Sequence, residues 1–119
     1  MFVNVSNHPS ELWLDKQKEC ALCYGDIVDV TFPAIHKDYD SNKYDELVEL
    51  YYERIMGICP DVVMVQGEFV FTYRLVGKLK ASGIRVVSAR SERVCQEFKD
   101  ENNVIHKHSL FEFIDFVDY

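Results

Sequence analysis

The stretch Asp61-Val62-Val63-Met64-Val65-Gln66-Gly67-Glu68 decides the fold that we expect for this chain. Residues 61–65 predict a buried strand, because the apolar residues in them are consecutive and do not alternate with polar ones. Gln66-Gly67-Glu68 then leads into a helix that is expected over about residues 68–82. The buried stripe of this helix is predicted to comprise Phe69, Tyr73, Val76 and Leu79. A fully apolar strand that leads directly into a helix is typical of a parallel sheet covered by helices.

The same alternation of strand and helix continues on both sides of this stretch. Further strands are predicted at residues 2–6, 26–32 and 84–89. Further helices are predicted at 10–24, which Gly25 would end, and at 43–58. One face of the first helix would hold Trp13, Gln17, Cys20, Ala21 and Tyr24. Strict alternation predicts an α/β fold, a Rossmann-like three-layer sandwich with parallel strands in the order 2-1-3-4.

The alternation stops after Ser91. Residues 94–98 and about 104–117 flank a polar turn at 99–103, which predicts a C-terminal antiparallel hairpin beyond the fourth strand. Ser109-x-x-Glu112 also fits a helix capping box, but the density of β-branched and aromatic residues favours a strand. With no repeat or linker, residues 1–119 are expected to form a single domain.

Composition excludes several classes of function. Apolar residues make up 48% of the chain and charged residues 28%, as in globular proteins. The net charge of −7 argues against general binding to duplex nucleic acid, although a small anionic ligand held by local basic residues stays compatible with it. The apolar runs are too short to cross a membrane and the N-terminus does not resemble a signal peptide, so a cytoplasmic protein is expected.

Cysteines and histidines give no strong sign of a metal or redox centre. The pair Cys20-x-x-Cys23 falls near the predicted end of a helix, where the dipole does not stabilise a thiolate. We therefore expect these two residues, Cys59 and Cys95 to be buried and chemically inert. His106-x-His108 would share one face of a strand but lacks a third ligand, so neither a metal nor another cofactor is predicted.

The predicted strand order places one candidate binding site at the carboxyl edge of the sheet. Ligands of such sheets bind where the winding direction reverses, here between the first and third strands. The residues that follow these strands and the fourth strand are Asn7, His8, Ser10, Gln66, Gly67, Glu68, Arg90, Ser91 and Arg93. They combine polar donors, a helix start and two guanidinium groups, as a phosphate-bearing ligand requires.

Each of these features also has a structural interpretation. The segment Asn7-His8-Pro9-Ser10 fits a helix cap, and Gln66-Gly67 fits a tight turn. Glu68 would favour the start of a helix without any ligand, and Arg93 could pair with Glu92 or Glu97. No G-x-G-x-x-G or P-loop motif is present, which argues against dinucleotide-dependent and P-loop enzymes.

Three stretches resemble those of a known group of proteins: Asn4-Val5-Ser6-Asn7-His8-Pro9-Ser10-x-x-Trp13, Val63-Met64-Val65-Gln66-Gly67-Glu68 and Ser91-Glu92-Arg93. The group comprises small CRISPR-associated Rossmann-like proteins, namely the CARF-related ring nucleases and cyclic oligoadenylate binders of antiviral defence. The resemblance implies a cyclic oligoadenylate bound across the two-fold axis of a homodimer. It also implies metal-free cleavage, in which a ribose 2′-hydroxyl attacks the adjacent phosphate and leaves a 2′,3′-cyclic phosphate.

Under this resemblance, the catalytic residues would be His8 for proton transfer and Arg93 at the phosphate. Asn7 and Ser10 would orient the ligand, and Gln66 and Glu68 would hold sugar or base edges. Two alternatives stay open: a non-catalytic module that binds a nucleotide or a protein, and a hydrolase or transferase that acts on another nucleotide. The aromatic C-terminal segment could be buried against a second copy or packed under the third helix; its members are Phe111, Phe113, Ile114, Phe116, Val117 and Tyr119.

Overall fold

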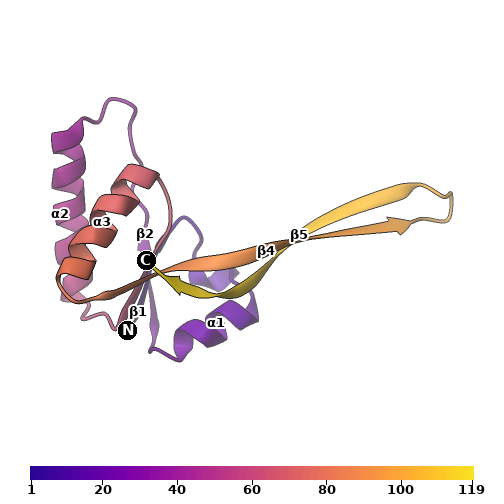
Figure 1. Cartoon of the computed structure of the whole chain (residues 1–119), viewed down its shortest axis with the longest axis horizontal. Helices are drawn as coiled ribbons and strands as arrows, with labels where there is room; N and C mark the ends of the chain where they lie inside the picture. Colours follow the sequence, from indigo (N-terminus) through magenta and orange to yellow (C-terminus); the bar gives the residue numbers. More distant parts are fainter.

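The computed structural model describes residues 1–119 and contains a five-stranded sheet in the order β2-β1-β3-β4-β5 (Figure 1). The strands are β1 (Phe2–Ser6), β2 (Ile27–Thr31), β3 (Val62–Val65), β4 (Arg85–Lys99) and β5 (Ile105–Asp118). The first four are parallel to their neighbours, and β5 pairs with β4 in the antiparallel direction. The predicted strand order and the terminal hairpin are therefore confirmed, and the last segment is a strand.

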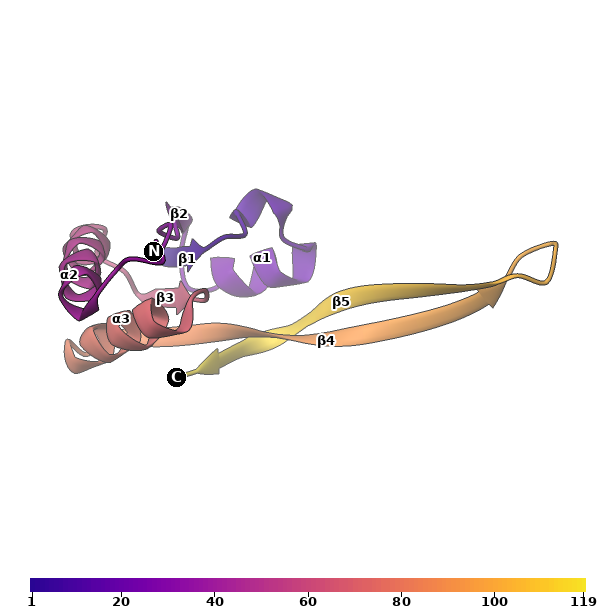
Figure 2. The ribbon, with the colours of Figure 1, turned by 90° about the horizontal axis from the view of Figure 1, so that it is seen from above.

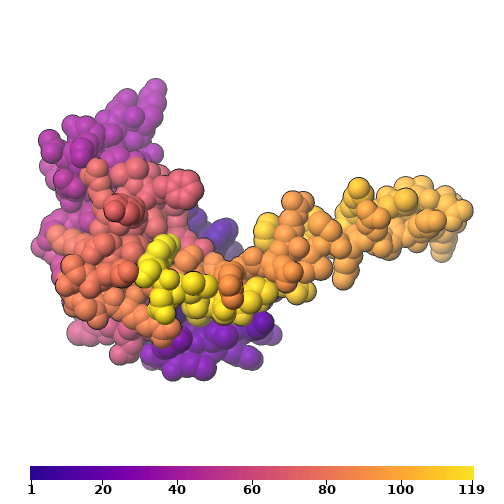
Figure 3. Space-filling view, in the orientation of Figure 1, coloured from indigo at the N-terminus to yellow at the C-terminus, as the bar shows by residue number.

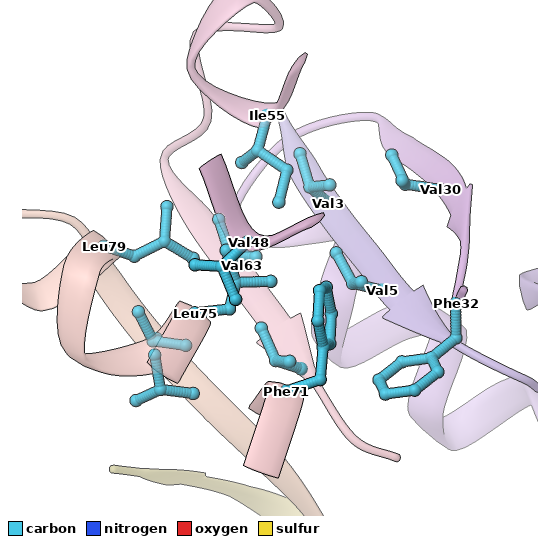
Figure 4. Close-up of a cluster of buried hydrophobic side chains, with 13 residues drawn as sticks. Val3, Val5, Val30, Phe32, Val48, Ile55, Val63, Phe71, Leu75 and Leu79 are labelled. Atoms are coloured by element: carbon cyan, nitrogen blue, oxygen red, sulfur yellow. The ribbon is translucent and has the colours of Figure 1, made fainter. Parts of the chain in front are cut away.

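Helices cover both faces of this sheet. They are a short 3-10 turn η1 (Ser10–Leu12) and the α-helices α1 (Asp15–Leu22), α2 (Ser41–Gly57) and α3 (Phe69–Ala81). Side chains on β1 alternate between two cores: Val3 and Val5 face α2 and α3, whereas Phe2 faces α1. Figure 4 shows the first core, in which Phe71 of α3 and Phe32 after β2 meet over Val5. The three-layer arrangement is thus the predicted one.

The prediction of one continuous helix over residues 10–24 was wrong. The backbone is extended at Trp13 and Leu14, so η1 and α1 are separate. The interruption lets the Trp13 ring pack edge-on against Phe2, with ring centroids 6.2 Å apart. The Trp13 indole also donates a hydrogen bond to the His8 carbonyl at 3.1 Å. Tertiary burial of the indole therefore overrides the local helix signal.

The predicted buried stripe of α3 was also partly wrong. Phe69 and Tyr73 are 89% and 82% exposed, whereas Phe71 and Leu75 are fully buried. The predicted Leu79 is buried, as is Val76. Apolar residues lie on more than one side of this helix, so their spacing alone cannot identify the side that packs on the sheet.

The terminal hairpin is longer than predicted and leaves the body of the protein. β4 continues without interruption through Ser91, and a bulge between Arg90 and Ser91 marks the position where the ribbon departs. Figures 1 and 2 show β4 and β5 projecting together beyond the rest of the chain, and we call residues 91–112 the arm. Nearly every arm residue is exposed, and the molecule extends over 58 × 38 × 21 Å.

The expectation of four buried cysteines was wrong. Cys20 is half-buried, but Cys23, Cys59 and Cys95 are exposed, and all four are free thiols. Cys23 ends α1, Cys59 adopts a positive φ of 57° in the turn after α2, and Cys95 lies on the arm. None of the helices is both long and apolar enough to cross a membrane.

Candidate functional site

A cavity of about 630 Å³ opens at the carboxyl ends of β1 and β3. The adjacent strands β2, β1 and β3 reverse the winding direction there, as expected for the ligand site of an open α/β sheet. Its apolar lining is Leu12, Trp13, Leu14, Met64, Ala89, Phe111 and Phe113. Its other lining residues are Ser6, Asn7, His8, Gln17, Gln66, Gly67 and Ser91.

The structure brings together five of the nine predicted site residues. Asn7, His8, Gln66, Gly67 and Ser91 all line the cavity, although they come from three separate segments of the chain. The other four, Ser10, Glu68, Arg90 and Arg93, are not among its lining residues. The hydrogen bonds of each residue explain its place.

A buried polar network holds the loop after β1. Asn4 is only 1% exposed, and its amide donates to the His8 carbonyl and to Asp29 Oδ1, both at 2.9 Å. The Ser6 hydroxyl donates to Asn4 Oδ1 at 2.7 Å and also accepts from the His8 backbone N–H at 3.2 Å. The Trp13 indole also donates to the His8 carbonyl, and together these hydrogen bonds fix the backbone at His8.

Ser10 anchors this loop to Asp29 and is not part of the cavity lining. Its hydroxyl donates to Asp29 Oδ2 at 3.0 Å, and its backbone N–H donates to the same carboxylate. Asp29 on β2 thereby connects Asn4 on β1 to the start of η1. The predicted ligand-orienting role of Ser10 is therefore replaced by a structural one.

Gln66 lines the cavity, but its carboxamide is already bonded. Its Oε1 accepts from the Ala89 N–H at 2.9 Å, and its Nε2 donates to the Ala89 carbonyl at 3.3 Å. Both ends of the side chain are thus occupied by the backbone of β4. Gln66 shapes the wall, and this geometry argues against the predicted contact of its amide with a base or sugar.

Gly67 is required by packing. A Cβ at this position would lie 2.3 Å from the Phe32 ring, closer than real side-chain contacts allow. Phe32 is 5% exposed and packs edge-on against Phe71 at 5.1 Å between centroids. The absence of a side chain lets the turn after β3 approach the core, and this turn is one wall of the cavity.

Glu68 caps α3. Its carboxylate accepts hydrogen bonds from the N–H groups of Val70 and Phe71, each at 2.9 Å. Desolvation is the largest influence on the pKa of Glu68 and raises it. The bonds from Phe71, Val70 and Tyr44 and the charge of Arg74 together outweigh desolvation and hold this pKa below its ordinary value. The structural interpretation of Glu68 thus accounts for its position without a ligand.

The two predicted arginines lie along β4 beyond the cavity. Arg90 forms a two-pronged ion pair with Asp115, with distances of 2.9 and 2.7 Å. Arg93 is the cross-strand partner of Phe111, a cavity residue, and its guanidinium donates to Ser109 Oγ at 3.1 Å. Directly opposed residues lie on the same face of a sheet, so Arg93 lies at the outer rim on the cavity side.

His8 is the only titratable group that lines the cavity. Its ring is exposed and has no hydrogen-bond partner within the chain, whereas its backbone is fixed by Asn4, Ser6 and Trp13. A free imidazole on a fixed backbone is suited to contact a ligand. The cavity thus combines aromatic walls, neutral polar groups and one histidine, without any Lys, Arg, Asp or Glu in its lining.

Comparison with known proteins identifies the family. The model of the uncharacterized protein MJ1673 family matches residues 1–117. The chain belongs to this family. The match includes β1, the segment after β3 and almost all of the β4–β5 hairpin, so the arm lies within the region that defines the MJ1673 family. No curated protein matches the chain.

Sequence reasoning missed two kinds of residue at this family's candidate site. The first kind organises the loop: Asn4 and Asp29 hold its backbone. A polar Asn4 and Ser6 within an otherwise apolar buried strand were a usable signal, because buried polar groups need partners. The second kind is the aromatic lining from Trp13, Phe111 and Phe113, which depends on tertiary packing.

Metal binding receives no support from side-chain clustering. No group of three or more His, Cys, Asp or Glu side chains is arranged to hold a metal ion. The His106 ring lies 2.9 Å from Asp100 at the tip of the arm and stacks on Phe98. The Asp100 carboxylate also accepts hydrogen bonds from the backbone N–H groups of Asn102 and Val104. Asp100 and His106 therefore stabilise the hairpin turn.

Proposed function

We propose that the cavity binds a nucleotide, with the base inside it and the phosphate at the rim near His8 and Arg93. The observation that supports this most is the division of chemistry between the two zones: the cavity lining holds no Lys, Arg, Asp or Glu, and Arg93 lies just outside it. A planar, uncharged heterocycle with an attached anion matches such a division. The volume of about 630 Å³ lies within the range of small-molecule sites and would hold one nucleotide unit.

Phe111 is the residue best placed to stack on the base. It is 68% exposed, whereas Trp13 and Phe113 are 8% and 4% exposed and already packed. Stacking on an exposed aromatic ring stabilises a base by about 1–3 kcal/mol in single-strand binding proteins. Gln17 and Asn7 lie on the same lining and supply neutral amides for the polar edges of the base.

The ligand class that we propose is a cyclic oligoadenylate, following the resemblance of the three site segments to CARF-related ring nucleases. One adenylate would occupy the cavity, and the remaining phosphates would follow the rim toward Arg93. A chain with a net charge of −7 needs such local positive charge for a polyanion.

Metal-independent cleavage is a second candidate function, and the free ring of His8 favours it. The ribose 2′-hydroxyl would attack the adjacent phosphorus, and His8 would accept its proton. The bond to the 5′-oxygen would break, the 5′-oxygen would take up a proton, and a 2′,3′-cyclic phosphate would form. Such a reaction depends on positioning and charge stabilisation more than on a strong base.

The test is titration calorimetry of the purified protein with cyclic tetra-adenylate and hexa-adenylate in EDTA, followed by chromatography of the nucleotides. Binding with conversion to 2′,3′-cyclic phosphate products indicates the enzyme, and binding without conversion indicates a sensing module. His8→Ala should abolish conversion, while His36→Ala, an exposed histidine outside the cavity lining, should not. If neither nucleotide binds, the proposal fails, and another nucleotide or a protein partner becomes the leading alternative.

A further inference from the structure

The arm leaves one edge of β4 without a partner strand. β3 pairs with β4 only over Arg85–Val87, and Gln66 satisfies the backbone of Ala89. From Ser91 to Lys99, no strand of the chain pairs with the outer edge of β4, and Figure 3 shows the arm as a narrow projection. An exposed edge of this length is a template for pairing with another strand, and an isolated two-stranded ribbon is only marginally stable in water.

We propose that this edge pairs with β4 of a second copy of the chain in the antiparallel direction, with Cys95 opposite the partner's Cys95. A two-fold axis at Cys95 makes the interface self-complementary and closed. It converts two ribbons into one continuous four-stranded ribbon. Such pairing satisfies the free N–H and C=O groups of alternate residues between Ser91 and Lys99 on both copies.

Charge complementarity selects this register. With Cys95 on the axis, Arg93 is opposite the partner's Glu97, and symmetry forms the same pair a second time. No like charges face each other within the paired segment. Centring the pairing on Val94 removes both ion pairs, and centring it on Gln96 places Arg93 opposite the partner's Lys99, which repels it.

The existing contacts of these side chains leave the edge accessible. Arg93 reaches Ser109, and Glu97 lies 3.7 Å from Lys107. Both of these partners are on β5, on the other side of β4 from the free edge. Both side chains of the Glu97–Lys107 pair are highly exposed, so this ion pair contributes little free energy. Glu97 is therefore available to pair with the partner's Arg93.

The same register brings a basic residue to the candidate site. Lys99 of the partner subunit would be opposite Ser91, which lines the cavity. Opposed residues in antiparallel strands share a face with Cβ atoms roughly 4.5–5.5 Å apart, so the partner's Lys99 would reach the cavity mouth. In the dimer, Arg93 pairs with the partner's Glu97, so the partner's Lys99 is the cation at the cavity mouth. This step rests on the proposed nucleotide binding, whereas the dimer does not.

The association is tested with the full-length protein by sedimentation equilibrium. The wild type should dimerise at micromolar concentrations. Arg93→Glu and Glu97→Arg should each raise the dimer dissociation constant about tenfold, because each replaces two attractive pairs by two repulsive ones. The double variant Arg93→Glu/Glu97→Arg should restore it. Lys107→Glu is the matched control, since it removes the in-chain partner of Glu97 but leaves the proposed edge intact, and it should leave the dissociation constant unchanged.

A monomeric wild type, or a dimer that is indifferent to both single reversals, would overturn the proposal. Circular dichroism of each variant separates lost association from lost folding. Mild oxidation should join Cys95 to the partner's Cys95, since Cα atoms roughly 5.5 Å apart fit a disulfide. Peptide mass spectrometry that finds dimers linked only through the exposed Cys23 or Cys59 would contradict the register.

The contribution of Lys99 is tested separately with cyclic tetra-adenylate. Lys99→Ala should lower the affinity about tenfold and leave the dimer intact. Equal affinity of the variant and the wild type would overturn the placement of Lys99 at the site. If the wild type binds neither cyclic tetra-adenylate nor cyclic hexa-adenylate, the proposed function and the role of Lys99 fail together, while sedimentation still decides the dimer.

Discussion

The carboxamide of Gln66 bonds both the N–H and the carbonyl of Ala89, at 2.9 and 3.3 Å. β3 ends at Val65, one residue earlier, whereas β4 continues far beyond this level. The side chain thus replaces the backbone of β3 for one more residue of pairing. It also forms the wall between the main cavity and a second one of about 460 Å³, which lies beside Thr72, Tyr73 and Tyr119.

Gln66→Ala should lower the free energy of unfolding by about 1–2 kcal/mol, because two partly buried backbone groups of Ala89 lose their partners. Urea denaturation followed by fluorescence measures this change. Gln96→Ala, on the exposed arm, is the matched control and should change the free energy by less than about 0.5 kcal/mol. Equal stabilities of the two variants would show that the Gln66 bonds contribute nothing measurable.

Glu68→Gln should destabilise the protein by about 1 kcal/mol at neutral pH, because the charged cap of α3 is lost. The pKa of Glu68 in the folded protein is below its ordinary value of 4.5. Its stabilising effect is therefore fully present above the pKa of the unfolded chain and is lost as the pH falls through the lower folded pKa. Urea denaturation at neutral pH and at several values below 4.5 should show the difference between wild type and variant shrinking with acidity. Glu53→Gln, an exposed residue on α2, controls for the general effect of removing a carboxylate, and a difference that persists in acid would contradict the mechanism.

The order of the strands followed from sequence because each signal for it was local. The apolar run Val62–Val65 and the glycines and prolines between elements specify where strands start and stop, and connection rules then leave few topologies. The convergence of Asn7, His8, Gln66, Gly67 and Ser91 on one cavity is a consequence of that topology. Residue roles were less predictable, since Ser10, Gln66 and Glu68 have polar side chains that bond their own backbone or a neighbouring strand.

Features that depend on tertiary context could not be predicted in the same way. The buried side of α3 is selected by contact with Val63 and Val65 on the sheet, and the spacing of Phe69 and Tyr73 fits a helix face equally well. The sequence did not predict that β4 continues through Ser91, because Glu92 and Arg93 are polar, as expected of an exposed ribbon. A strand with no core to face does not show the usual alternation of apolar and polar residues.

Asp29→Ala should weaken binding of cyclic tetra-adenylate about five- to tenfold, because the loop with Asn7 and His8 loses its anchor. The Asp29 carboxylate joins Asn4 to Ser10, so its removal frees both ends of the segment that presents His8. Titration calorimetry measures the affinity, and urea denaturation measures the accompanying loss of stability. Asp26→Ala changes an exposed carboxylate at the other end of β2 and should leave the affinity unchanged. Undiminished affinity in Asp29→Ala would mean that Asn4, Ser6 and Trp13 hold the loop without Asp29.

Phe111→Ala should lower the affinity for cyclic tetra-adenylate about tenfold while leaving the melting temperature nearly unchanged. The ring lines the cavity yet is 68% exposed, so its removal takes away a stacking surface without opening a void in either core. Phe98→Ala is the matched control, because Phe98 is 55% exposed, stacks on His106 and lies on the face of the ribbon opposite to Phe111. Calorimetry of both variants separates a specific stacking contact from a general effect of exposed aromatic rings. A similar loss of affinity in both would mean that the arm as a whole contacts the ligand, and no loss in either would remove Phe111 from the site.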